Sequence, residues 1–291
     1  MRQSSQEPRS SGRSVLGALV LAIAALLTVF VGAARAEPPN SGPLDVRAVY
    51  KITFAGIDIG TFNFRSRLDN RGYNADATAK LSALLGAFQW SGNTRSSGAL
   101  AGLEPKPSVY NYDFKSNSKT GSVSLGFKGE RIASLDVVPA KPPHPEAVPL
   151  QEQHLKGVLD PLSAVIALTR TGTANPCDRK LPIFDGKQRF DLALSYRGQR
   201  RIDEKRPSGQ PGVSFVCAVR YQPIAGHRPD NDETRKFAAN GSIEIAMRPV
   251  PSANLMVPHH VLIPSAWGQA ELRLQRVDIS SPGKAEIALV Q

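Results

Sequence analysis

The chain has 291 residues, 41% of them hydrophobic, and a formal net charge of +11 at pH 7. This composition excludes an intrinsically disordered chain, because the apolar content suffices for a sizeable core. A basic balance can indicate nucleic-acid binding, yet the N-terminal segment described next predicts export from the cytoplasm. Outside it, the expected partners are anionic lipids, glycans or other envelope proteins, and the alternative is a solvated basic surface.

Residues 1–36 have the three parts of a secretory signal peptide. Basic residues precede an apolar run over 15–31, and the Ala-Arg-Ala of 34–36 is a small-x-small cleavage pattern. The alternative is a transmembrane anchor, since an apolar run of this length approaches the lower limit for spanning a bilayer. Removal is favoured, because a cleavage pattern follows the apolar run where an anchor would have a charged stop-transfer cluster. Cleavage leaves 291 − 36 = 255 residues with no further transmembrane segment.

Cys177 and Cys217 are the only two cysteines. An even pair in a chain bound for an oxidising compartment predicts a disulfide. In the chain-entropy model, closing a loop of about 40 residues stabilises the fold by roughly 4 kcal/mol. The spacing is not the C-x-x-C of redox or metal sites, so we interpret the pair as structural.

The first half of the chain has the alternating pattern of half-buried strands. Residues 84–92 fit either a turn or a strand, and 37–45 is expected to be an extended lead-in to one domain over 46–291. Residues 139–149 carry five prolines and predict a crossing without sheet structure. The expected strands are 48–54, 57–68, 73–81, 109–114, 123–127 and 132–137.

One helix is predicted after this crossing. Apolar residues recur at helical spacing over 155–166. Asp160 is a strong N-cap and Pro161 suits the first helical position, so the helix is expected over Pro161–Leu168, with a separate turn in 151–157. We expect this short helix to lie between two β halves.

The second half again has strand patterns, and its clearest signal is the Asp185-Gly186 turn of a hairpin. Charged or polar loops are expected at 197–206 and 226–236. With the first half this predicts ten to fourteen strands and an all-β fold, a curled or barrel-like antiparallel sheet with one short helix packed against it. The expected strands are 181–184, 187–196, 213–221, 242–247, 261–263 and 269–279.

The sequence has none of the common hydrolase, phosphate-loop or dinucleotide motifs. Of the five histidines, only His259 and His260 are adjacent, and neighbours on a strand point to opposite faces, which makes joint metal ligation awkward. His144, His154 and His227 lie near no patterned nucleophile. The sequence therefore assigns no catalytic residue, no metal ligand and no cofactor.

Three weaker patterns have structural alternatives. The oxygen-rich run 230–233 could hold Ca²⁺ or be a solvated loop. The aromatic residues Trp90 and Trp267 fit a core or rim position better than a sugar platform. A basic cluster could meet anionic lipid or glycan, or be a solvated loop, and it comprises Arg197, Arg200, Arg201, Lys205 and Arg206.

Four short motifs occur in a characteristic order: 50–60 (YKITFAGIDIG), Leu103-Glu-Pro105 with Tyr110-x-Tyr112, 160–163 (DPLS) and 181–186 (LPIFDG). In this order they resemble the domain-of-unknown-function 3108 family of secreted bacterial proteins, over most of 46–279. The resemblance implies a periplasmic protein of the Gram-negative envelope with a barrel-like β fold. It implies no established catalytic residues, so no ligand-binding residue is carried over.

A strand-rich chain with aromatic alternation, a basic surface and no catalytic pattern favours a binding or scaffolding role. We expect a soluble periplasmic envelope protein that holds a lipid, glycan or protein partner in a concave face. The alternative is a hydrolase or transferase acting on envelope polymers, which needs a carboxylate pair or a Ser/His site in one cleft. A purely structural assembly subunit would instead present a large flat apolar surface.

Overall fold

The computed structural model describes residues 42–140, 142–170, 175–239, 243–265 and 268–291. Within the chain, Ser41–Gln291 forms one compact unit. The expected signal peptide and Trp267 lie outside the described residues.

The described strands all belong to one antiparallel sheet of fourteen strands, which confirms the predicted all-β class. The sheet curls but does not close, because β7 and β8 remain as its two ends. Its first meander contains β1 (Leu44–Phe54), β2 (Ile57–Leu68), β3 (Gly72–Ala83), β4 (Phe88–Ala101), β5 (Glu104–Ser116), β6 (Thr120–Lys128) and β7 (Arg131–Val138). The second contains β8 (Arg179–Phe184), β9 (Arg189–Arg201), β10 (Val213–Ala225), β11 (Ile243–Val250), β12 (Leu255–Ser265) and β13 (Gly268–Ser280).

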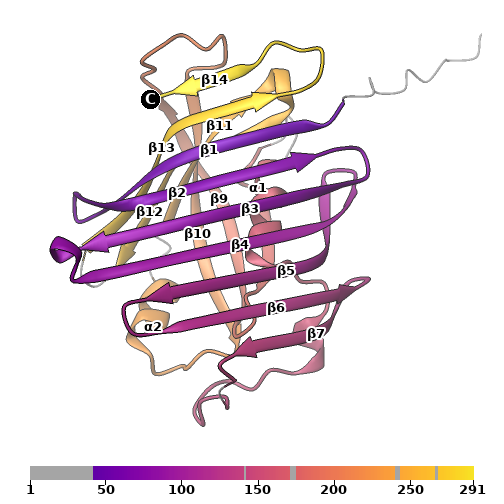
Figure 1. Ribbon diagram of the computed structural model, residues 1–291, viewed down its shortest axis with the longest axis vertical. Coiled ribbons are helices and arrows are strands. Elements are labelled where there is room, and N and C mark those ends of the chain that lie inside the picture. Colours follow the sequence, from indigo (N-terminus) through magenta and orange to yellow (C-terminus); the bar gives the residue numbers. More distant parts are fainter. Residues whose placement is uncertain (1–41, 141, 171–174, 240–242, 266–267) are drawn as a thin grey trace, which may run out of the picture. The chain divides into compact units, whose positions relative to one another are not determined.

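The two meanders are joined where β1 pairs with β13, so strands from opposite ends of the domain lie side by side. A last short strand, β14 (Ile287–Val290), adds to β13 outside the main path. In Figure 1 the first meander forms the front layer and much of the second lies behind it. The sheet therefore folds over on itself and leaves an interior between its layers.

Helix α1 (Pro161–Thr169) lies in this interior and packs against β3, β4, β5, β8 and β12. It begins at Pro161 with Asp160 as the N-cap, as predicted, and ends one residue beyond the predicted Leu168. The expected turn before it is the 3₁₀ helix η2 (Glu152–Leu155). The helix is thus the element that both halves of the sheet share.

The segment just before α1 bridges the two ends of the sheet. The Gly157 amide donates to the Glu130 carbonyl (2.7 Å) in the turn between β6 and β7. Two residues later, Leu159 exchanges backbone hydrogen bonds with β8, through the Pro182 carbonyl (2.8 Å) and the Phe184 amide (2.9 Å). These bonds cover part of both edges, which otherwise present unpaired backbone groups to other chains.

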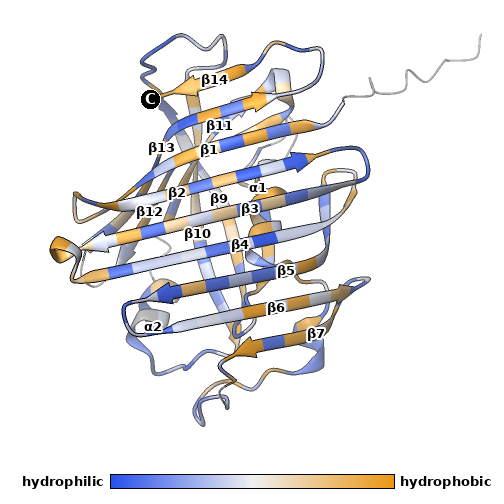
Figure 2. Cartoon of the chain, in the orientation of Figure 1, coloured by the Kyte–Doolittle hydropathy of each residue, from blue (hydrophilic) through white to orange (hydrophobic). Residues whose placement is uncertain are grey.

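Alternation along the strands produces the apolar interior. On β2, Phe64, Ser66 and Leu68 are buried while Arg65 and Arg67 are exposed, as the period-2 pattern predicts. Figure 2 shows the same alternation of orange and blue along the front strands.

The Cys177–Cys217 disulfide forms as predicted. Both cysteines are fully buried and belong to a core cluster with Ala164, Ala167 and Leu168 of α1. Cys177 follows α1 in the chain, and Cys217 lies on β10. The disulfide therefore links these two parts of the structure.

The predicted charged loop over 197–206 is wrong in its first half. Arg197, Arg200 and Arg201 belong to β9, which continues to pair with β10 beyond a register shift near Gly198. Sequence alone favoured a loop because three of these residues are charged and Gly198 interrupts the alternation. A bulge tolerates that interruption without ending the strand.

The predicted polar loop over 226–236 is also partly wrong, because it contains the start of α2 (Asp232–Ala239). The Asn231 side-chain oxygen accepts from the Thr234 amide (3.0 Å) and caps this helix. Its sequence is too polar to show an apolar stripe.

Two further boundaries differ from the prediction at the start of strands. Leu44 and Asp45 belong to β1, not to an extended lead-in. Pro105 and Pro107 lie inside β5, in a stretch that pairs with β4 but precedes the first β6 pair at Val109. Proline is tolerated there because its missing N–H faces no partner strand.

The position of α1 predicts that Leu162→Asp destabilises the whole domain. Leu162 is 3% exposed in the main core, so the variant buries an unpaired carboxylate and loses apolar contacts. Urea denaturation should show a loss of at least about 4 kcal/mol, or no folded protein. The matched control, Leu150→Asp in the proline-rich crossing, replaces a leucine that is 38% exposed and should unfold like the wild type. Equal stability of the two variants would make α1 peripheral.

Replacing both cysteines by alanine should lower the free energy of unfolding by about 4 kcal/mol, since the disulfide closes a loop with a sequence separation of 40. Denaturation with and without reductant checks this. Reductant should affect the wild type alone and leave the double variant unchanged.

Candidate functional site

The interior contains an apolar cavity of about 220 Å³ between α1 and the two layers of the sheet. It is partly open to solvent, neither sealed nor flat. Its walls come from β1, β2, β11, β12, β13 and α1, that is, from both meanders and the helix between them. They include Ala48, Phe62, Phe64, Val165, Leu168, Ile245, Met256, Val261 and Leu272.

Local sequence explains why space remains here. The small residue Ala48 sits in the middle of β1, in register with Phe64 on one side and Val277 on the other. On α1, Val165, Leu168 and Thr169 recur at helical spacing and form the face that lines the cavity. The small side chain of Ala48 therefore leaves space opposite a helix surface whose own residues do not fill it.

The chemistry of the cavity is apolar. Its polar side chains are the hydroxyls of Ser66, Thr169 and Tyr50, and Tyr50 donates to the Pro258 carbonyl (2.9 Å). Burial raises the pKa of Tyr50 above its ordinary value, so the phenol stays neutral. An engineered apolar cavity of about 150 Å³ stays dry and binds benzene. The volume here accommodates a somewhat larger apolar group.

A cluster of buried polar side chains holds the N-terminus of α1 against the sheet. Asp160 Oδ1 accepts from the amides of Leu162 (3.0 Å) and Ser163 (2.9 Å). Its Oδ2 accepts from Ser96 Oγ of β4 (3.0 Å) and from Ser163 Oγ. Tyr73 of β3 completes the cluster through Ser163 Oγ (2.5 Å).

The geometry of this cluster indicates a structural role. Asp160 and Ser163 are fully buried, and both carboxylate oxygens of Asp160 are hydrogen-bonded within the protein. Burial raises the pKa of Asp160, against the opposing effect of these hydrogen bonds, and raises the pKa of Tyr73 to about 12. Neither Asp160 nor Ser163 lines the cavity. They fix the helix and leave no free nucleophile.

The histidine pair lies on β12. His260 Nε2 is 3.3 Å from Glu271 Oε2 on β13, whereas both ring nitrogens of His259 are buried without a partner. Burial and the positive charges of His260 and nearby arginines lower the pKa of His259 to about 4. Neither histidine lines the cavity. The pair therefore does not form a hydrolytic centre there.

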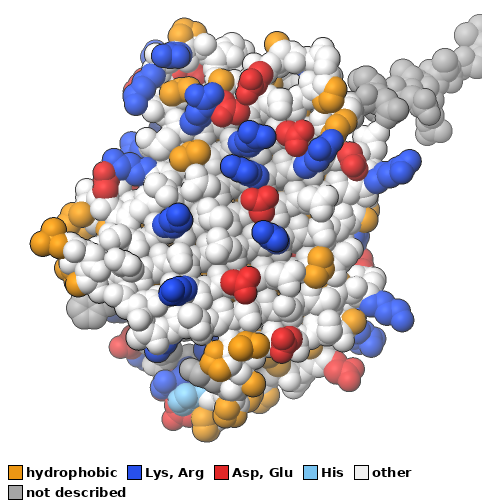
Figure 3. Space-filling view, in the orientation of Figure 1, with side chains coloured by type: hydrophobic (Ala, Val, Ile, Leu, Met, Phe, Trp, Pro, Cys, Tyr) orange, Lys and Arg blue, Asp and Glu red, His pale blue; other side chains and the backbone are white. Residues whose placement is uncertain are grey.

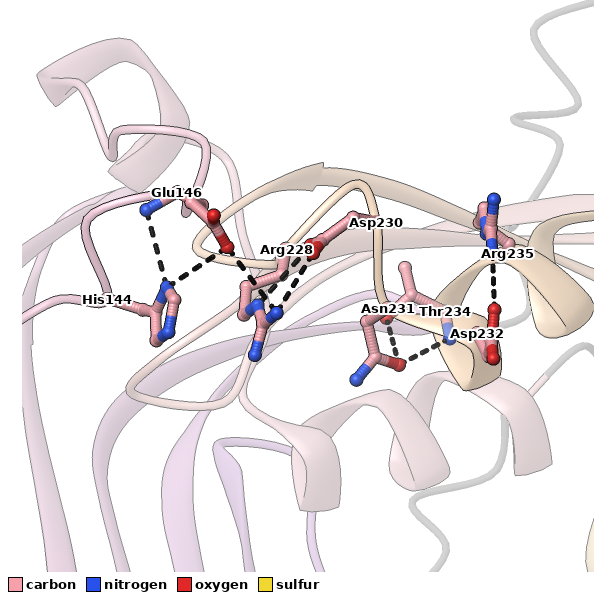
Figure 4. A network of polar contacts seen from close by, with 8 residues as sticks. All are labelled: His144, Glu146, Arg228, Asp230, Asn231, Asp232, Thr234 and Arg235. Carbon is pink, nitrogen blue, oxygen red and sulfur yellow. Dashed lines mark hydrogen bonds and ion pairs between the residues drawn. The ribbon is translucent and has the colours of Figure 1, made fainter.

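Residues 230–232 of the oxygen-rich run are occupied by protein contacts (Figure 4), and the side chain of Glu233 lies outside the described part of the structure. Asp230 pairs with Arg228 (2.9 Å), Asp232 pairs with Arg235, and the Asn231 oxygen caps α2. The carboxylates of Asp230 and Asp232 have depressed pKa values because of the hydrogen bonds from these arginines. The structure thus gives these oxygens a role in the loop and in the start of α2.

The remaining candidates lie apart from the cavity. Arg200 pairs with Glu244 across β10 (2.8 Å), and Trp90 is half-buried on β4.

The structure also contains a buried ion pair that the sequence did not predict. Arg248 is a fully buried arginine that pairs with Glu204 and donates to Ser208 (3.0 Å). Sequence could not find this ion pair, because its partners lie in separate segments with ordinary surface composition.

Within the described ranges, no group of three or more His, Cys, Asp or Glu residues is arranged to hold a metal ion.

The sequence did not show which residues line the cavity. Its residues come from five strands and a helix, and each looks like an ordinary core position. The aromatic alternation on β2 is the one signal that pointed toward it.

The comparisons with known proteins name no activity. The family model "Protein of unknown function (DUF3108)" matches residues 49–275. The chain belongs to the DUF3108 family. The predicted resemblance is thereby confirmed, and the description of DUF3108 assigns no site. No curated protein and no solved structure matches the chain. Among the described residues, no helix has the length and apolar character needed to cross a membrane.

Because His259 is buried, we expect the free energy of unfolding to fall as the pH is lowered. The folded pKa of His259, about 4, lies below the ordinary value of 6.5, so its contribution to stability is present above pH 6.5 and is lost as the pH falls toward 4. His259→Phe should match the wild type at pH 8 and exceed it in urea denaturation at pH 4.5. The control His144→Gln, at an exposed histidine, should follow the wild type at both pH values. Parallel pH profiles of His259→Phe and wild type would contradict the assignment.

Proposed function

We propose that this protein is a non-catalytic binding protein of the bacterial periplasm whose interior cavity holds the apolar part of a lipid-like molecule. The observation that carries the proposal is the cavity of about 220 Å³ between α1 and the curled sheet. Ligand pockets of this kind are concave, mostly apolar and supplied with a few polar groups that orient the ligand.

The wall chemistry supports an alkyl or acyl chain over a sugar. A glycan would need several hydrogen-bonding groups to replace its hydration, since a buried polar group without a partner costs on the order of 1–3 kcal/mol. The cavity offers the hydroxyls of Ser66 and Thr169, while that of Tyr50 is engaged with Pro258. An apolar chain needs no partners and gains about 25 cal/mol per Å² of apolar surface removed from water.

The groups that could act in catalysis lie away from the cavity. The carboxylate with the strongest burial, Asp160, is fully bonded in the helix cap, and the His260–Glu271 pair lies away from the cavity walls. A hydrolase or transferase would need such groups to converge on the bound molecule. No specific observation favours that alternative.

Filling the cavity should weaken binding without unfolding the protein. Val165→Phe adds a ring to the half-buried helix face that lines the cavity. Titration with a fluorescent fatty acid, read by fluorescence enhancement, should show affinity lowered by about tenfold or more relative to wild type. Val165→Ala, which enlarges the cavity, should keep binding. Val109→Phe, at a residue on β5 that is 39% exposed, is the matched control for adding a ring.

Native mass spectrometry of protein purified from the envelope identifies the natural ligand. The expected result is a bound mass of lipid size that is lost in Val165→Phe. Equal fatty-acid affinity of wild type and a folded Val165→Phe variant would overturn the proposal.

A further inference from the structure

The turn between β3 and β4 exposes apolar side chains at one end of the sheet. Leu84 is 80% exposed, and Leu85 is fully exposed. Phe88 follows at 44%, and Ile57, the first residue of β2 after the neighbouring turn, is 68% exposed. Figure 3 shows hydrophobic side chains gathered at the left end of the molecule, where Figure 1 places the β3–β4 turn.

The backbone of this turn does not favour leucine. Leu84 and Leu85 both have positive φ, 53° and 55°, a conformation that glycine or asparagine adopts with less strain. No residue of the turn's 3₁₀ helix η1 (Leu84–Gly86) is buried, so the leucines do not stabilise the core. Two large apolar side chains therefore occupy positions where neither packing nor backbone conformation calls for them. Strained and exposed residues of this kind point to a binding role.

Basic side chains surround the turn. Lys80 precedes it on β3, and Lys115 and Lys119 flank the next turn along this end of the sheet. That turn is tied to the first by Asn117, which accepts from the Gln89 amide (2.6 Å) and donates to the Ala87 carbonyl (3.1 Å). Within the described ranges the three lysines form no ion pair.

Two carboxylates near this end of the sheet form ion pairs. Asp58 pairs with Lys51 (2.6 Å). Glu271 pairs with Arg273 and His260, each at 3.3 Å. A third carboxylate, Asp113 on β5, lies two residues before Lys115 and forms no ion pair among the described residues. The three lysines outnumber it, so the net charge of this end is positive.

We propose that the end of the sheet formed by Leu84, Leu85, Phe88 and Ile57, with the lysines beside them, docks reversibly on an anionic lipid bilayer. Apolar side chains on a narrow turn can enter the boundary between headgroups and acyl chains, while lysines remain with the phosphates. Each basic residue near an anionic surface adds about 1 kcal/mol. This charge complementarity selects a membrane over a second copy of the chain, whose corresponding end would carry the same positive charge. The docking end is separate from the cavity and goes beyond the proposed binding function.

Flotation of the full mature protein with vesicles tests the docking end. Wild type should float with equimolar phosphatidylglycerol and phosphatidylcholine, and binding should weaken with added salt. The double variant Leu84→Asn/Leu85→Gly should lose about tenfold or more in affinity while remaining folded, because both new residues suit a positive φ. The triple variant Lys80→Gln/Lys115→Gln/Lys119→Gln should lose on the order of fivefold per lysine.

Two controls keep the result specific. Leu103→Asn changes a leucine that is 38% exposed in the turn between β4 and β5, at the opposite end of the sheet, and should float like the wild type. Val165→Phe, which blocks the cavity, should also float, so failure of the cavity proposal leaves docking intact.

Either of two outcomes would overturn the docking proposal. One is equal flotation of wild type and the Leu84→Asn/Leu85→Gly variant. The other is a wild type that does not float. If that wild type forms a dimer in sedimentation that this double variant abolishes, the occupant is a second copy of the chain.

Discussion

A buried carboxylate at the start of one short helix organises this fold. Asp160 caps α1 through two backbone amides and reaches β4 and β3 through Ser96, Ser163 and Tyr73. Placing a carboxyl group in the interior is costly unless hydrogen bonds compensate it, and here both oxygens are bonded. The same short segment bonds to the β6–β7 turn and to β8, so one stretch of chain holds the helix, the front layer and the far edge together.

The cavity follows from this arrangement. With α1 held against β3, β4 and β5 at its first turn, its later residues Val165, Leu168 and Thr169 face the other strands across a gap. The disulfide holds the chain that follows the helix to β10 of the second meander. A sheet that folds over a helix of two turns buries a large apolar surface but does not fill the space beside it.

Polar groups in this protein mostly stabilise structure. Asp160 caps a helix, Arg228 and Arg235 pair with Asp230 and Asp232, and Arg248 ties the loop before β10 to β11. Two features stand outside that pattern, the apolar cavity and the leucines of the β3–β4 turn. Both are apolar surfaces that the fold leaves uncovered, and they lie in different parts of the domain. A molecule that meets bilayers at one end and shelters an apolar chain inside would use the two together.

The sequence by itself determined the all-β class, the strand alternation, the start of α1 and the disulfide, because these depend on local periodicity, capping chemistry and an even cysteine count. It did not determine where β9 ends or that α2 exists. Gly198 can end a strand or sit in a bulge, and only pairing with β10 decides between them. The cavity required the tertiary structure for a related reason. Its walls come from β1, β2, β11, β12, β13 and α1, and no local pattern shows which core residues face a neighbour and which face a gap.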